Sequence, residues 1–245
     1  MNPDALLPAL RHFGVRHVEH AGWRTRNHGT LDAHALVVHD TVTGSMSDER
    51  AAAFCAAGRS DLAGPPYECL VGRDGRAHLI AHGVTWQAGR GNGARFRQAE
   101  AGRMPLDVEL GRPGPDDYGA ANQRSHGVAL ITYGAGPYTA EQVEAAARVC
   151  AAYCRAEGWG EHGAASMIGH GELTARKIDP ALDMGQLRTR THALVMDLDE
   201  TWHVVTAGDT LWSLARRYST TVDTLRRLNN LQSDVIGVGW RLRVR

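Results

Sequence analysis

The sequence lacks any long apolar run. No stretch reaches the roughly 18 consecutive apolar residues that a membrane-spanning helix needs. The N-terminal segment MNPDALLPALRHFG also lacks the basic start and the small-residue cleavage site of a secretory signal peptide. We therefore expect a chain that does not insert into a membrane and that the ordinary export route does not carry out of the cell.

Cysteine is scarce, with four residues in the chain. Their spacing includes no Cys-x-x-Cys pair, so a metal site built on thiolates is not expected. A chain without a signal peptide is not expected to meet an oxidising compartment, which argues against a disulfide framework. We expect four reduced thiols, with Cys150 and Cys154 buried on one face of a helix.

The chain has no net charge and almost no lysine. Acidic and basic residues balance at 27 each, and of the 27 basic residues only Lys177 is a lysine. The balance is uneven along the chain, because residues 203–245 hold seven Arg and three Asp, a net charge of +4, which leaves −4 for the rest. This mildly basic tail favours anionic cell-wall polymers and is too weak to indicate nucleic-acid binding.

Short apolar runs mark the expected strands. Residues 35–38 suit a strand that is buried on both faces. The runs 69–71 and 77–80 flank an Asp-Gly turn, which is typical of a β-hairpin. Residues 128–133 are predicted to form another buried strand.

Capping residues mark two helices. Ser47 precedes two acidic residues and an alanine-rich stretch, so a helix is predicted from there to Gly58. Thr139 with Gln142 three residues later forms a predicted capping box at the start of a helix that continues to Gly158.

The alternation of strands and helices predicts an α/β domain with one mixed central sheet flanked by helices. We assign this domain to residues 1–197, with its core at about 30–195, and a short linker to residues 198–202. From residue 203 to residue 245 the pattern changes to strand, helix, helix, strand, which predicts a second, small βααβ domain.

Three residues have the chemistry of a catalytic metal site. His39 follows the strand 35–38, His170 lies between two glycines, and Asp179 precedes Pro180. Two imidazoles and one carboxylate leave a fourth position open, as in catalytic rather than structural zinc sites. Spacing alone leaves a packing role for these side chains equally open.

Four stretches of the chain, taken in order, carry a family resemblance. They are Val37-Val38-His39-Asp40, residues 67–75 (YECLVGRDG), residues 122–128 (NQRSHGV), and residues 169–180, which begin with Gly169-His170 and end with Lys177-Ile178-Asp179-Pro180. They resemble the signatures of the type 2 N-acetylmuramoyl-L-alanine amidases, a family that shares its fold with animal peptidoglycan recognition proteins. The resemblance covers about residues 30–195 and implies that His39, His170 and Asp179 bind Zn²⁺. Some phage members use Cys where this chain has Asp179, and that substitution keeps the zinc interpretation intact.

Two further residues match the catalytic side chains of the phage enzymes, namely Tyr67 and Lys177. Some bacterial members carry a catalytic Glu where this chain has Ala129, so the resemblance favours a mechanism assisted by tyrosine and lysine. The single lysine supports this assignment, because a chain that uses Arg elsewhere retains Lys where a compact point charge is needed. We expect His34, His82 and His126 to be polar packing or to support ligands rather than to bind the metal. Trp86 and the glycine-rich stretch that follows it could line a glycan groove or form a simple exposed loop.

The C-terminal 43 residues resemble a LysM repeat over their whole length. A core is expected from Val204, Leu211, Leu214, Leu225, Leu228 and Leu242, and Asp209 is expected to cap the first helix. The resemblance implies that two loops bind N-acetylglucosamine units through Gly208, Asp209, Thr210, Leu211, Asn230 and Leu231.

Together these features predict an enzyme that hydrolyses the amide between N-acetylmuramic acid and L-alanine in bacterial peptidoglycan. The chain resembles a bacteriophage endolysin, made in the host cytoplasm and acting on the glycan strand and stem peptide of the wall after release. We expect a monomer. Three alternatives stay open: a host autolysin, which would need an export signal; a metallopeptidase acting within the stem peptide; and a non-catalytic peptidoglycan receptor, a class that typically lacks a zinc ligand.

Overall fold

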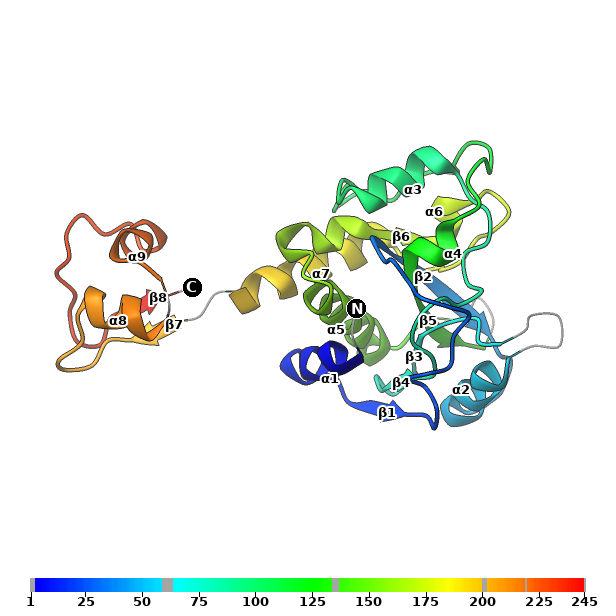
Figure 1. Cartoon of the computed structure of the whole chain (residues 1–245), viewed down its shortest axis with the longest axis horizontal. Coiled ribbons are helices and arrows are strands. Elements are labelled where there is room, and N and C mark those ends of the chain that lie inside the picture. The colour runs from blue at the N-terminus through cyan, green and yellow to red at the C-terminus, as the bar shows by residue number, and fades with distance from the viewer. Residues whose placement is uncertain (1–2, 59–63, 134–136, 200–201, 219, 245) are drawn as a thin grey trace. The chain divides into compact units, whose positions relative to one another are not determined.

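The computed structural model of the chain describes residues 3–58, 64–133, 137–199, 202–218 and 220–244. It divides into two compact units, Met1–Val195 and Met196–Arg245 (Figure 1). Within the described residues, no helix is both long enough and apolar enough to cross a membrane.

A six-stranded mixed sheet forms the centre of the larger unit, with the strand order β1-β4-β3-β5-β2-β6. The strands are β1 (His17–Glu19), β2 (Ala35–Val42), β3 (Cys69–Val71), β4 (Ala77–Leu79), β5 (Ser125–Thr132) and β6 (Met167–Gly169). β3 and β4 pair antiparallel, and the other neighbouring strands pair parallel. This confirms the predicted hairpin and the mixed α/β class.

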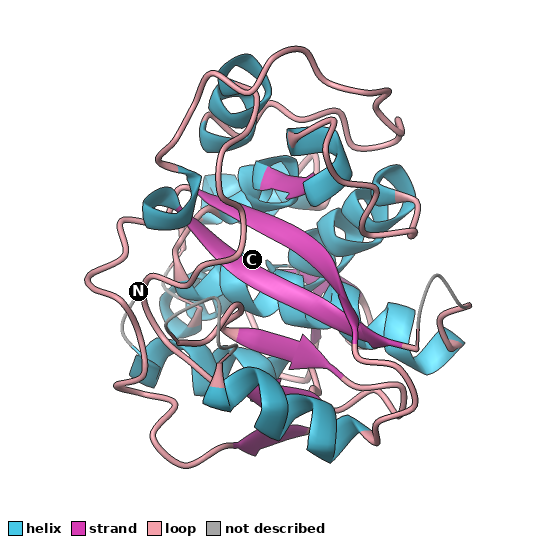
Figure 2. Cartoon of the chain, turned by 90° about the vertical axis from the view of Figure 1, so that its right-hand side faces the viewer, coloured by secondary structure: helices cyan, strands magenta, loops and turns pink. Residues whose placement is uncertain are grey.

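Helices lie on both faces of the sheet (Figure 2). They are α1 (Pro3–His12), α2 (Asp48–Ala57), α3 (Gly93–Glu100), α4 (Ala121–Arg124), α5 (Ala140–Ala156), the 3-10 helix η1 (Gly160–Ser166), α6 (His170–Leu173) and α7 (Met184–Asp199). α2 packs on β3 and β5 through a cluster that includes Ala52, Leu70 and Ile131. α5 contacts β3 and β5, and the Tyr153 ring of α5 lies 4.8 Å from that of His126.

The two longest strands, β2 and β5, run side by side at the centre, with His39 opposite Ala129. β2 extends four residues beyond the predicted run, so His39 and Asp40 lie within the strand and not at its exit. Pairing with β5 continues through these polar residues and satisfies backbone groups on that side, so the strand does not end where the apolar run ends. A central strand is a rigid support for a functional side chain.

The predicted helix starts and ends are largely confirmed. Ser47 caps α2 by accepting a hydrogen bond from the Arg50 backbone N–H, and Gly58 ends that helix with a φ of 79°. The Thr139 hydroxyl likewise accepts from the Gln142 backbone at the start of α5. The prediction that the Gln142 side chain completes the capping box is wrong. The buried Gln142 amide instead donates to two strand carbonyls, those of Val71 and Ile131, at 2.9 Å each.

All four cysteines are free and buried, as expected. Cys150 and Cys154 are both buried in α5. Burial raises the pKa of the Cys154 thiol to about 12. These thiols are therefore packing groups and not nucleophiles.

The smaller unit has the predicted βααβ order, with β7 (Trp202–Val204), α8 (Leu211–Arg217), α9 (Val222–Leu228) and β8 (Arg241–Arg243). Its core consists of Val205, Leu211, Leu214, Ala215, Leu225, Leu242 and Val244. Val204 was expected in this core and is 57% exposed, because the strand alternation that turns His203 inward turns Val204 outward. Leu228 is half-buried.

Asp209 does not cap α8, contrary to expectation. Thr210 is the N-cap and forms a reciprocal capping box with Ser213. The Asp209 carboxylate instead accepts from the backbone of Thr206 and lies 2.7 Å from His203 Nε2. It therefore fastens the turn between β7 and α8.

Candidate metal centre

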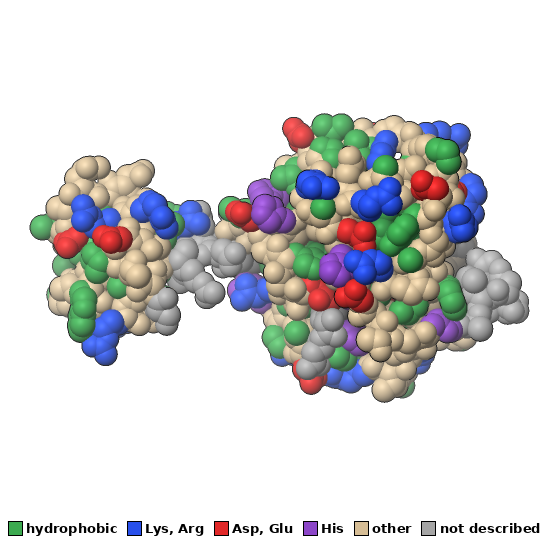
Figure 3. Space-filling model, turned by 45° about the horizontal axis from the view of Figure 1, so that its top comes forward, with side chains coloured by type: hydrophobic (Ala, Val, Ile, Leu, Met, Phe, Trp, Pro, Cys, Tyr) green, Lys and Arg blue, Asp and Glu red, His purple; other side chains and the backbone are tan. Residues whose placement is uncertain are grey.

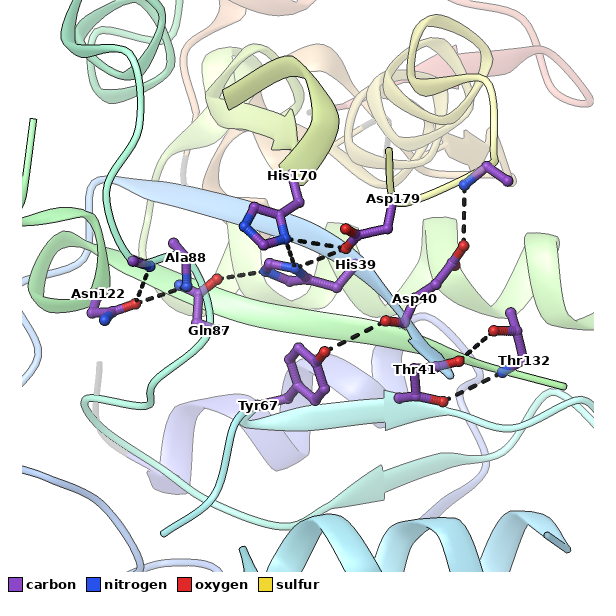
Figure 4. Close-up of polar contacts among 12 residues, drawn as sticks. His39, Asp40, Thr41, Tyr67, Gln87, Ala88, Asn122, Thr132, His170 and Asp179 are labelled. Carbon is purple, nitrogen blue, oxygen red and sulfur yellow. Dashed lines mark hydrogen bonds and ion pairs between the residues drawn. The ribbon is translucent and has the colours of Figure 1, made fainter. Parts of the chain in front are cut away.

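Three side chains from separate elements converge beside the central strand β2 (Figure 4). His39 projects from β2, His170 begins α6 immediately after β6, and Asp179 follows in the segment between α6 and α7. His39 Nδ1 lies 3.1 Å from His170 Nδ1 and 3.3 Å from Asp179 Oδ2, and His170 Nδ1 lies 3.2 Å from the same oxygen. The sheet order, which places β6 beside β2, brings together residues 131 positions apart.

These distances fit a tetrahedral zinc ion. Zinc bonds of about 2.0 to 2.1 Å place neighbouring ligand atoms of a tetrahedral site about 3.3 to 3.4 Å apart. The three separations are close to three edges of such a tetrahedron. In the described part of the chain this is the one group of histidine, cysteine and acidic side chains close enough to hold a metal.

The electrostatics of the three residues also favour a cation. Burial, followed by the proximity of His170, lowers the pKa of His39 to about 4, which keeps its imidazole neutral and able to act as a ligand. Burial alone would raise the pKa of Asp179, but the contacts of its carboxylate with the His170 and His39 rings outweigh burial and bring that pKa well below its usual range. The site thus contains an ionised carboxylate, whose negative charge a cation would neutralise.

The segment that carries Asp179 is fastened on two sides. Its carbonyl accepts a hydrogen bond of 2.6 Å from the Gly171 N–H in α6. The neighbouring Ala181 N–H donates to Asp40 Oδ2 on β2 at 3.1 Å. The same Asp40 carboxylate accepts from the Tyr138 hydroxyl at 2.7 Å. Asp40 therefore holds the segment that carries Asp179 against β2, the strand that carries His39.

A buried ion pair between Arg188 and Glu172 stabilises the start of α6, the helix that begins with His170. Arg188 of α7 is fully buried and donates from Nη1 to Glu172 Oε2 at 2.8 Å and from Nη2 to Oε1 at 3.0 Å. Glu172 also accepts the Gly169 N–H at 2.9 Å, at the base of α6. Arg188 further binds the carbonyls of Pro105 and Val108, so one guanidinium joins α7, α6 and the segment before residue 110. Composition gives no signal for this, since arginine is rarely buried.

The two residues matched to catalytic side chains lie at this site. The Tyr67 ring lies 5.2 Å from the His39 ring, and its hydroxyl donates to the Asp40 carbonyl at 3.4 Å. Lys177 is exposed and lines a cavity of about 230 Å³ together with Asp179 and Pro180. Tyr67 therefore borders His39, and Lys177 shares a cavity with Asp179. On the face of the larger unit turned to the viewer in Figure 3, acidic, basic and histidine side chains gather near the centre.

Gln87, which supports His39, was not predicted from the sequence. Gln87 is 6% exposed, and its Oε1 lies 2.6 Å from His39 Nε2. It lies in a segment of irregular structure, and no periodicity or spacing marked it.

The three histidines expected in packing or supporting roles lie outside the ligand cluster. His126 is buried between the carboxylates of Glu68 and Glu157, at 2.7 Å from each. His34 pairs with Asp32 at the surface. His82 packs at the Trp23 ring, 6.2 Å between centroids. Trp86 is 39% exposed, with its ring 5.0 Å from that of His28.

The residues expected to bind sugar in the smaller unit lie in two loops. Gly208 and Asn230 have φ values of 92° and 52°, so each loop turns through a left-handed residue. Asn230 and Leu231 line an open pocket that includes Arg226 and Arg227. Leu211 is 2% exposed and belongs to the core of the smaller unit, so its side chain is not available to a ligand.

Two family models match the chain. Residues 29–182 match the model described as N-acetylmuramoyl-L-alanine amidase, and residues 203–245 match the LysM domain model. The first match includes every residue of the metal cluster.

Comparison with individual proteins gives partial matches. The "Probable endopeptidase p60" of Listeria welshimeri is 56% identical over 41 residues, which are 17% of this chain and 8% of that protein. The chain thus spans less than a tenth of the length of that relative. Among solved structures, the Staphylococcus aureus hydrolase AmiA has a TM-score of 0.46 and 13% identity, covering 75% of this chain and 85% of that one. The Ph2119 endolysin of a Thermus scotoductus bacteriophage has a TM-score of 0.43 and 18% identity, covering 72% and 99%.

Proposed function

The chain belongs to the N-acetylmuramoyl-L-alanine amidase family, and we propose that its hydrolysis of peptidoglycan depends on a zinc ion held by His39, His170 and Asp179. The observation that carries this proposal is the convergence of two Nδ1 atoms and one carboxylate oxygen within 3.3 Å of one another. Three protein ligands leave one position of a tetrahedral site for water or substrate.

The chemistry that bound zinc supplies is Lewis acidity, which lowers the pKa of a water molecule to about 7. The Lys177 ammonium, at the rim of the cavity beside Asp179, is suited to stabilise the negative charge that develops on the carbonyl oxygen of the scissile amide. The Tyr67 hydroxyl, beside His39, is suited to orient water or substrate. The bond cleaved joins the lactyl group of N-acetylmuramic acid to L-alanine.

The second unit extends this function to the intact wall. We assign residues 1–197 to the catalytic domain and residues 203–245 to a wall-binding domain that takes N-acetylglucosamine units of the glycan strand. Residues 198 and 199 of the assigned linker belong to α7, residue 202 begins β7, and residues 200 and 201 lie outside the described residues. We also propose that the protein is a monomeric endolysin of bacteriophage origin, which acts on the host wall after release from the cytoplasm.

Mass spectrometry of purified peptidoglycan after digestion tests the bond that is cleaved. The expected products are stem peptides that begin with free L-alanine and glycan strands with free lactyl carboxylates. Peptides cut within the stem would instead identify a metallopeptidase, and undigested material would identify a binding protein.

Metal removal tests the role of zinc in the same assay. Chelation should abolish activity, and about one zinc ion per chain should restore it. His39→Ala, His170→Ala and Asp179→Ala should lose both metal and activity, because three ligands leave no spare donor. His34→Ala, at the exposed pair with Asp32, is the matched control and should keep both. Full activity of the metal-free protein would exclude the zinc mechanism.

A further inference from the structure

The amide of Gln87 bridges the metal cluster and the start of β5 (Figure 4). On one side its Oε1 lies 2.6 Å from His39 Nε2. On the other side its Nε2 lies 2.8 Å from the Ser125 hydroxyl oxygen and 3.2 Å from the Ser125 carbonyl oxygen. All three residues are buried, so water does not compete for these bonds.

The partners of the amide determine which way it points. A backbone carbonyl can only accept hydrogen bonds, so the Gln87 group that faces the Ser125 carbonyl is the amino group. The Ser125 hydroxyl donates its own hydrogen to the Ala121 carbonyl at 2.7 Å, which leaves its lone pairs free to accept from Gln87. The carbonyl oxygen of the Gln87 amide must therefore be the atom that faces His39.

That orientation fixes the proton on the histidine. An amide oxygen can only accept, so the hydrogen of a neutral His39 ring lies on Nε2. We propose that Gln87 is a positioning residue that holds His39 in the tautomer whose Nδ1 lone pair faces His170 and Asp179. A metal-binding histidine needs this second contact to set both its tautomer and its ring orientation.

The surrounding segment is built to hold Gln87 in place. The backbone N–H groups of Ala88 and Gly89 both donate to Asn122 Oδ1, at 2.7 and 3.1 Å. A Cβ atom at Gly127 would lie 2.8 Å from Gln87 Cγ, so only glycine leaves room for this side chain across β5. Asn122, Ser125 and Gly127, all within the stretch 122–128, thus hold or accommodate Gln87 and its segment. Zinc binding by the three ligands does not by itself require these residues.

The inference rests on the proposed ligand set, and its test separates the two. The tautomer of His39 is read from its ring ¹⁵N chemical shifts in the metal-free protein, and zinc affinity is measured by competition with a chelator. If the wild type binds no zinc, the proposed function fails, while the tautomer measurement still tests Gln87.

Two variants distinguish hydrogen bonding from packing. Gln87→Leu keeps the volume and removes the acceptor, so the His39 proton should shift toward Nδ1, where Asp179 accepts it, and zinc affinity should fall about 10- to 100-fold. Gln87→Glu keeps an oxygen that accepts from Nε2, so the wild-type tautomer should return. Its zinc affinity should recover only in part, because the second carboxylate oxygen faces the Ser125 carbonyl, to which the Gln87 amide donates. Gln98→Leu, at an exposed position of α3, is the matched control.

Thermal unfolding of each metal-free variant shows first that it is folded. The proposal is wrong if folded Gln87→Leu retains both the Nε2–H signature and the wild-type affinity. It is also wrong if folded Gln87→Glu shows the same His39 tautomer as Gln87→Leu, because an accepting oxygen at position 87 would then not determine where the His39 proton lies.

Discussion

Lys177 is set apart from the other cations of the chain by chemistry and by position. It is the single lysine, and among the described residues no hydrogen bond or ion pair engages its ammonium group. Its neighbour Arg176 is bonded instead to Asp116 at 2.6 Å and to the Arg90 carbonyl. An unengaged cation at the rim of the site is available to a substrate, whereas Arg176 serves the loop around it.

We expect Lys177→Arg to lower kcat at least about tenfold while zinc stays bound, because a planar guanidinium cannot occupy the position of a compact ammonium. Hydrolysis of a soluble muropeptide and metal content measure the two effects. Arg176→Lys is the reciprocal control and should keep nearly wild-type turnover. Wild-type turnover of Lys177→Arg would remove the catalytic role from Lys177.

Among single residues, the sequence marks the proposed ligands better than the residues that hold them in place. His39, His170 and Asp179 were proposed as ligands from their residue types and motifs, because metal chemistry restricts the side chains that can serve, and the structure brings the three together. Gln87, Asp40 and Arg188 were not identified in their supporting roles. Their roles depend on which segments the fold places side by side, and glutamine, aspartate and arginine are common at surfaces.

Among the elements, α5 and two strands are joined through one buried histidine. His126 lies on β5, Glu68 directly precedes β3, and Glu157 is the C-cap of α5. Burial alone would lower the pKa of His126, but the two carboxylates outweigh it and raise the pKa to about 9. The protonated ring is thus part of the folded state at neutral pH.

This pKa predicts how stability changes with pH. The folded pKa of about 9 exceeds the unfolded value of 6.5, so the contribution of His126 is fully present below pH 6.5 and is lost as pH rises through 9. Urea unfolding of metal-free protein between pH 6 and pH 9 should show a decrease in the free energy of unfolding. The decrease should be much smaller in His126→Gln and unchanged in His34→Gln. Equal pH dependence in wild type and His126→Gln would contradict this assignment.

Elements with strong local signals were predicted well, and those held by tertiary contacts were not. α2, α5 and the β3–β4 hairpin carry caps or turn residues that act over a few positions. β2 continues through Asp40 and Thr41 because β5 pairs along its whole length. No signal identified α7, whose first half carries the fully buried Arg188 where a helix usually buries an apolar side chain.

For the whole molecule, the α/β class and the βααβ order of the second unit were predicted correctly. Two separate cores explain why, because each unit packs its own apolar residues and shows its own pattern. The exchange of Val204 for Val205 in the smaller core shows the limit, since a shift of one residue in a strand reverses the face.

A chain that ends at residue 201 tests the division of labour between the units. If residues 203–245 act as a tether that raises the local concentration of the enzyme at the wall, the truncated protein should hydrolyse a soluble muropeptide within about twofold of wild type. Its pelleting with sacculi and its lysis of whole walls should fall together. The fragment 203–245 alone should pellet with sacculi and be displaced by chitin oligomers. Loss of activity on the soluble substrate by a truncated chain with normal thermal unfolding would show that the second unit completes the active site.

The pairing of β6 with β2 has a consequence for how the protein folds. The two histidines lie 131 positions apart, so the ligand set is complete only after most of the larger unit has been synthesised and its last strand has docked. Contacts of such long range form slowly, because chain entropy opposes their closure. Zinc would therefore bind late and bind only the native state, adding about 2.7 kcal/mol to the free energy of unfolding at a concentration 100 times its Kd. Cellular metal supply would then influence the lifetime of the finished enzyme rather than the path by which it forms.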